Sequence, residues 1–134
     1  MDIREELLTE ILIRVRKNCT CMAEIERMTK EIAEAFSRED KESVSILLNM
    51  RKKEIDSIAA TRNELHVIVE AQDKEIRSEI EDLFFKEEKP KTSHPLCDKI
   101  WDMNRQMIQM KKDILTIDEA MSKKIARTDS FYQG

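Results

Sequence analysis

Glycine is almost absent from this chain of 134 residues: its single glycine is Gly134, and its only prolines are Pro90 and Pro95. A β-rich fold needs a turn roughly every ten residues, and glycine and proline supply many of those turns. Phosphate-binding loops, dinucleotide-binding folds and nucleophile elbows also need glycine, where backbone approaches a ligand or takes a positive φ. The sequence therefore excludes these sites from residues 1–133 and predicts a few long helices.

Aromatic residues are also scarce, at 4%, whereas charged residues reach 39% and hydrophobic ones 40%, a mixture typical of long helices. No apolar run approaches the roughly 18 residues of a membrane span, and the acidic residues 1–6 do not resemble a signal peptide. The net charge is −4, and acidic and basic residues alternate without a basic patch for nucleic acid. We expect a cytoplasmic protein that binds neither nucleic acid nor membrane.

The three cysteines, Cys19, Cys21 and Cys97, are an odd number that suits a reducing compartment. With His94 they could form four metal ligands, but helical residues two apart diverge by about 200°, so Cys19 and Cys21 cannot face one ion. His66 lies two residues after Glu64, which is not the Glu-x-x-His of di-iron bundles. We expect free thiols, no metal, no cofactor and no catalytic residue.

Hydrophobic periodicity predicts three helices, at about 3–36, 41–85 and 96–128. In the first helix, apolar residues alternate at spacings of three and four, which is typical of helices packed side by side. Leu7, Leu12 and Met28 widen this stripe, as two neighbouring helices require. The predicted seam of the first helix is Leu8, Ile11, Val15, Asn18, Met22, Ile25, Thr29, Ile32 and Phe36.

The second helix follows a break of only four residues, 37–40, which forces it to run antiparallel to the first. Ser37 and Asp40 are both candidate N-caps. On the predicted seam, Arg51 and Arg62 either bind a partner's carboxylate or, as is commoner, lay their stems on apolar surface. The seam is Val44, Leu48, Arg51, Ile55, Ile58, Arg62, Leu65, Val69, Gln72, Ile76, Ile80 and Leu83.

A polar loop, 86–94, leads to the third helix, and Pro95 suits its first turn. We expect one all-α domain, 1–128, formed by three long antiparallel helices in an up-down-up, coiled-coil-like bundle, and a flexible tail at 129–134. The third seam is Leu96, Ile100, Met103, Met107, Met110, Ile114, Ile117 and Met121.

Methionine occupies half of this third seam. Methionine is flexible, and it recurs on surfaces that accept several partners. These residues either fill the bundle core or form a face shared with a client helix. A second apolar stripe, Trp101, Ile108 and Leu115, gives the helix two such faces. The predicted client-binding residues are Met103, Met107, Met110, Ile114, Ile117 and Met121.

Three stretches resemble the FlgN-like flagellar export chaperones. A long helix ends in an acidic joint, 35–40, and passes into 44–62, whose leucines, charges and arginines are similar to the family's. The stretch Trp-Asp-Met-Asn-Arg-Gln-Met holds Asn104, although Met107 stands where the family often has a second asparagine. The ending, 130–134, looks like the family's tyrosine-to-glycine tail.

This resemblance implies a cytosolic chaperone without cofactor or enzymatic activity. Such a chaperone binds the C-terminal helical segment of late flagellar substrates, chiefly hook-associated proteins, and delivers them to the export machinery. Tyr132 is then the candidate contact with the export gate.

Other functions fit the same periodicity. A non-secretory coiled-coil adaptor, or another helical export chaperone similar to FliT, has equivalent patterning, and a homodimer stays open. A helical chorismate mutase also opens on a long helix, with arginines such as Arg14 and Arg16. That enzyme binds a dianion in a pocket of convergent basic residues, whereas only Arg51 and Arg62 lie on the predicted seams.

Overall fold

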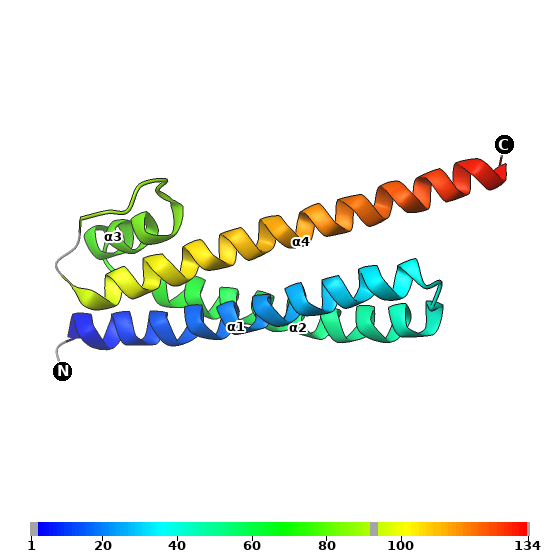
Figure 1. Cartoon of the computed structure of the whole chain (residues 1–134). Helices are drawn as coiled ribbons and strands as arrows, with labels where there is room; N and C mark the ends of the chain where they lie inside the picture. Colours follow the sequence, from blue (N-terminus) through cyan, green and yellow to red (C-terminus); the bar gives the residue numbers. More distant parts are fainter. Residues whose placement is uncertain (1–2, 92–93, 134) are drawn as a thin grey trace.

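The computed structural model describes residues 3–91 and 94–133, with side chains described for residues 4–91 and 94–127. The described chain is all-α, as predicted, and contains no strand. Its four helices are α1 (Ile3–Ser37), α2 (Lys41–Glu70), α3 (Lys74–Phe85) and α4 (Pro95–Gln133) (Figure 1). Within these residues no helix has the length and apolar content needed to cross a membrane.

The three long helices alternate in direction, and the short α3 lies near the start of α4 (Figure 1). Helix α1 packs along both α2 and α4, whereas the backbones of α2 and α4 do not contact each other. The arrangement is therefore an open one, in which α1 forms the base and the other two long helices form two separate walls.

The predicted seam of α1 is confirmed. Every seam position from Leu8 to Ile32 is buried, and Phe36 is half-buried. Leu12 and Met28 beside the seam are buried as well. A wide buried stripe is expected because α1 is the helix with two long neighbours.

The predicted seam of α2 is wrong at alternate positions. Leu48 and Ile55 are 42% and 47% exposed, and Arg62 is exposed too. The helix buries the predicted seam residue Ile58 and also Thr61, which lies outside the predicted seam. Because α2 has only α1 as a long neighbour, one narrow stripe is covered and the adjacent stripe faces the space beside α4.

The prediction of one helix over 41–85 is also wrong, since α2 ends at Glu70 and α3 begins at Lys74. The Asp73 carboxylate accepts a hydrogen bond from the Ile76 backbone N–H at 3.0 Å, which caps α3. The Gln72 side chain, expected on the seam, donates instead to a backbone carbonyl of α2. The three-helix bundle is therefore corrected to four helices in the described chain.

The break between α2 and α3 lets α3 fold back against the end of the bundle at which α4 begins (Figure 1). Its two buried residues, Ile80 and Leu83, join a core that α1 and α4 also form. The other buried members of this first core cluster are Leu8, Ile11, Leu12, Val15, Cys97 and Ile100. A second cluster farther along the bundle contains Cys21, Met22, Ile25, Ile58 and Ile114.

The ends of the other helices follow from local chemistry. Asp40 caps α2, as one of the two predicted caps, by accepting a hydrogen bond from the Ser43 N–H at 3.1 Å. The Ser43 hydroxyl donates to the same carboxylate at 2.6 Å, and these bonds lower the pKa of Asp40. Ser37 is instead the last residue of α1. Helix α4 begins at Pro95 and its backbone stays helical to Gln133, beyond the expected end at residue 128.

Candidate functional site

The space between α2 and α4 holds a cavity of about 560 Å³, whose base is α1 and whose one end is closed by α3. We call this cavity, with the uncovered surface that continues from it, the α2–α4 groove. Its lining is predominantly apolar. The apolar lining residues are Val15, Met22, Leu65, Val69, Ile80, Phe84, Phe85, Met107 and Ile108.

Charged residues on the cavity lining are divided between its two ends. Glu81 belongs to α3, and Glu70 is the last residue of α2, so both carboxylates lie toward the closed end. Arg62 and Lys111 lie farther from α3 along their helices. The groove is therefore acidic near α3 and basic toward the opposite end.

An uncovered apolar stripe extends the groove beyond the cavity. On α2, Val69 and the exposed Arg62 line the cavity seven residues apart, and the exposed Ile55 and Leu48 follow at the same interval. Seven residues are almost two full turns, so these side chains share one face. On α4, the exposed Leu115 follows the lining residue Ile108 at the same interval. From Val69 to Leu48 the stripe is about 32 Å long at 1.5 Å per residue.

At the closed end, the ring of Phe85 lines the cavity and is 82% exposed. Its neighbour Phe84 is anchored, because the Asn104 side-chain amide donates to the Phe84 carbonyl at 3.2 Å. On α4, Arg105 stacks its guanidinium 3.9 Å from the centre of the buried Trp101 ring. Arg105 also donates to the backbone carbonyl of Lys86, so it and Asn104 hold the end of α3 against α4 and present Phe85 at the rim.

The predicted client-binding residues of α4 differ in their burial and in whether they line the cavity. Ile114 is only 7% exposed and belongs to the second core cluster. Met107 both packs against that cluster and lines the cavity. The remaining four are half-buried and do not line the cavity. Met103 and Met110 pack against the core clusters, and Ile117 and Met121 lie farther along α4.

Sequence reasoning missed most of the groove-lining residues, among them Phe84, Phe85 and His66. The signal that was available is the second stripe of the third predicted helix, since Ile108 lies in the cavity lining. Tyr132, the predicted export-gate contact, has a side chain outside the described residues.

Arg51 connects all three long helices through its side chain. One of its terminal nitrogens donates to the Thr29 hydroxyl at 3.0 Å and to the Asp118 carboxylate at 2.9 Å. The Arg51 side chain is 16% exposed and that of Asp118 is 34% exposed. Arg51 is thus a structural residue that joins the two groove walls across α1. Arg62 is exposed on the rim and has no ion pair among the described side chains.

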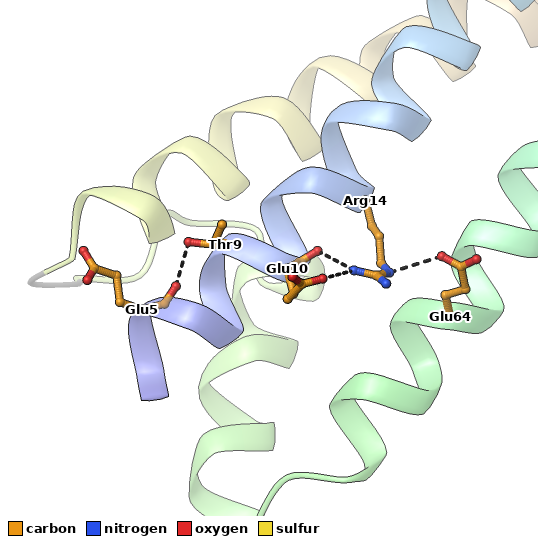
Figure 2. Close-up of polar contacts among 5 residues, drawn as sticks. All are labelled: Glu5, Thr9, Glu10, Arg14 and Glu64. Carbon is orange, nitrogen blue, oxygen red and sulfur yellow. Dashed lines mark hydrogen bonds and ion pairs between the residues drawn. The ribbon is translucent and has the colours of Figure 1, made fainter. Parts of the chain in front are cut away.

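Arg14 is likewise occupied within the bundle (Figure 2). Its guanidinium donates to Glu10 at 2.7 Å and to Glu64 of α2 at 3.2 Å. The hydrogen bond to Glu10 is the main cause that raises the pKa of Arg14. One turn before, the Thr9 hydroxyl donates to the Glu5 backbone carbonyl at 2.7 Å. Arg14 therefore links α1 to α2.

The three cysteines are free thiols. Cys19 contacts Gln106 of α4 at 3.9 Å, whereas Cys21 contacts Ser57 of α2 at 3.8 Å, which confirms that the two side chains diverge. Burial raises the pKa of all three thiols. Among the described side chains, no cluster of three or more histidine, cysteine or acidic groups is placed to hold a metal ion.

One buried polar group at the base of the groove lacks a partner. Asn18 lines the cavity and is only 4% exposed, yet its side-chain oxygen Oδ1 makes no hydrogen bond. A buried acceptor without a donor costs free energy, so native proteins contain few of them. The Oδ1 atom itself is shielded from water, so it lies beneath the cavity surface rather than on it.

Comparison of the chain with protein-family models, curated proteins and solved structures gives no match. The resemblance to FlgN-like chaperones accordingly rests on the sequence stretches described above. The α2–α4 groove is the structural feature from which a function can be argued.

Proposed function

We propose that this chain is an export chaperone that binds an amphipathic helix of a client protein along the α2–α4 groove. The observation that carries the proposal is the uncovered apolar stripe of α2, with Ile55 and Leu48, which faces the space beside α4. This arrangement suits the helix-in-groove mode of recognition, in which side chains about one and two turns apart act as anchors.

The dimensions of the groove favour a helix over a small ligand. A small molecule fills a cavity of roughly 300–1,000 Å³ and has no use for apolar surface beyond it. The stripe of about 32 Å corresponds to a helix of roughly 21 residues at 1.5 Å per residue. The base and two walls would give that helix the neighbours it has in a closed bundle. Its acidic residues would lie over Arg62 and Lys111, and its basic residues over Glu81, since Glu70 already pairs with Arg77 at 3.6 Å.

The energetics suit a client that must also be released. Each client side chain buried in the groove contributes roughly 1.5–3 kcal/mol before the costs of ordering and association. Four or five such side chains support micromolar binding after those costs. Met107 in the lining lets the groove adapt to clients of different sequence.

The class of client comes from the sequence resemblance. It favours hook-associated proteins, whose C-terminal helical segment would occupy the groove, and delivery to the flagellar export machinery. Tyr132 remains the proposed export-gate contact. Tyr132→Ala should leave client binding unchanged and reduce secretion of the client, measured in culture supernatant. A loss of client binding in this variant would contradict the separate role of Tyr132.

A matched pair of substitutions tests the groove. Ile55 and Ile46 are both about half exposed on α2, but nine residues at 100° each place them on opposite faces. Ile55→Asp should weaken binding of a purified hook-associated C-terminal segment at least tenfold by isothermal titration calorimetry, because it puts a charge in the apolar stripe. Ile46→Asp should leave the affinity unchanged.

Two results would contradict the proposal in different ways. Equal effects of Ile55→Asp and Ile46→Asp would show that the α2–α4 groove is not the binding surface. Absence of binding by the unaltered protein would remove hook-associated proteins as clients. Circular dichroism of both variants checks that they stay helical, which is expected because both positions are exposed.

A further inference from the structure

Glu81 and Phe85 form a neighbouring pair of side chains at the closed end of the groove. They lie four residues apart on α3, so they share one face of that helix. Both line the cavity, Glu81 is exposed, and Phe85 is 82% exposed. An occupant of the groove therefore meets a carboxylate and an aromatic ring at the same place.

The Glu81 carboxylate lacks a positive partner, although cations lie on both sides of it in the sequence. Arg77, one turn before Glu81, is paired with Glu70 at 3.6 Å. Lys86, the next cation after Glu81, is paired with Asp82 at 3.6 Å. Glu81 itself makes no ion pair or hydrogen bond with any side chain in the described part of the chain. A cation from an occupant would therefore find this carboxylate unpaired.

A carboxylate beside an aromatic ring suits an arginine side chain. A guanidinium can donate two parallel hydrogen bonds to one carboxylate, and its planar group also stacks on an aromatic face. The chain already contains such a stack, because the Arg105 guanidinium lies 3.9 Å from the centre of the Trp101 ring. A neutral side chain at this place would leave Glu81 without a charged partner.

We propose that Glu81 and Phe85 form the recognition site for an arginine near one end of the client helix. This inference rests on the proposed function, because the arginine belongs to an occupant of the same groove. The occupant is an amphipathic helix of a partner protein with an apolar seam and an arginine at the end beside α3. Charge complementarity supports this placement, since Arg62 and Lys111 farther along the lining repel a cation. The arginine would thus fix which end of the client lies against α3.

The test uses three synthetic peptides of about 21 residues, long enough to match the stripe. All carry leucine at the inner seam positions and identical charged flanks. They differ only in the residue at both the first and the last seam position, which is arginine, glutamine or leucine. These residues have similar helix propensity, and changing both ends makes the comparison independent of the direction of binding. The Kd of each peptide is measured by fluorescence anisotropy against the full chain and its variants.

The arginine peptide should bind the unaltered chain about tenfold more tightly than the glutamine peptide, through an ion pair and a cation–π contact at an exposed site. The ratio of the glutamine-peptide Kd to the arginine-peptide Kd should fall about threefold in Glu81→Gln and about threefold in Phe85→Leu. Glu75→Gln is the matched control, because Glu75 is exposed on α3 but does not line the cavity. It should leave the ratio unchanged. Circular dichroism should show that all three variants stay helical, since each position is exposed.

A ratio within twofold of one for the unaltered chain would overturn the recognition of arginine while leaving the groove as the binding surface. A leucine peptide that binds as tightly as the arginine peptide would overturn it in the same way. Equal falls of the ratio in Glu75→Gln and Glu81→Gln would attribute the preference to overall charge and overturn the site. Failure of all three peptides to bind would overturn the helix-binding groove, and the arginine site with it.

Discussion

The link between Arg51, Thr29 and Asp118 gives the sharpest stability prediction. Since the backbones of α2 and α4 do not contact each other, this link is a direct polar connection between the two groove walls. We consider Asp118→Ala, Arg51→Met and the double variant. Asp118→Ala leaves the guanidinium, on a side chain only 16% exposed, without its carboxylate. Arg51→Met removes the charge and leaves a carboxylate that is one-third exposed to water.

The magnitude follows from these exposures. Exposed ion pairs contribute about 0–1 kcal/mol, whereas breaking a fully buried pair costs about 3–5 kcal/mol. The Arg51–Asp118 pair lies between these limits, so Asp118→Ala should lower the free energy of unfolding by about 2 kcal/mol. Arg51→Met should lower it by about 1 kcal/mol, because the methionine keeps the apolar stem and Thr29 still bonds the Ile25 carbonyl. The coupling in the double variant should be about 1 kcal/mol.

Urea unfolding followed by circular dichroism measures all four free energies, with the slope checked for constancy between variants. Two results would refute the reasoning. A coupling energy below about 0.3 kcal/mol would mean that the pair adds nothing to stability, as for many surface pairs. A larger loss in Arg51→Met than in Asp118→Ala would mean that burial of the unpaired guanidinium is not the main cost.

Two further predictions concern α3 and the cysteines. Asp73→Ala should lower the free energy of unfolding by about 1 kcal/mol, because the N-cap of α3 is lost. Asp73→Asn should leave that free energy nearly unchanged in the same urea titration. Equal losses in the two variants would show that the cap is not the cause. Burial raises the pKa of Cys19, Cys21 and Cys97, so all three should react with Ellman's reagent more slowly in the folded chain than in urea. The unfolded chain loses its thiol protons from about pH 8.5, while the folded chain retains them. The free energy of unfolding should therefore fall as pH rises above that value. A triple Cys→Ala variant should lose less stability over the same pH range.

Local sequence signals predicted some helix boundaries and missed another. Asp40 and Pro95 were identified as start signals, and α2 and α4 begin beside them. Asp73 is an equally good cap, but the 3–4 spacing continues through it from Val69 to Ile76. The continuous apolar spacing therefore predicts one helix, although Asp73 is a start signal for α3.

The groove was largely beyond sequence reasoning because two registers of α2 fit the same pattern. Positions 44, 51, 58 and 65 belong to both registers, which differ in choosing 47 and 54 or 48 and 55 between them. Composition favours the second register, since Ile55 is apolar and Glu54 is charged. The structure covers the first register and exposes the second, because α1 packs on one side of α2 and the backbone of α4 stays away from the other.

The sequence by itself determined that this protein is all-α and that α1 carries a wide apolar stripe. With one glycine, at residue 134, and two prolines the chain has few places to turn, and the wide apolar stripe from Leu8 to Ile32 requires two neighbours. Only the tertiary structure decided that α2 and α4 stay apart and leave Ile55 and Asn18 in a groove. A periodicity of 3.5 residues indicates that one face of a helix is buried, but it does not indicate which helix, or which other protein, covers that face.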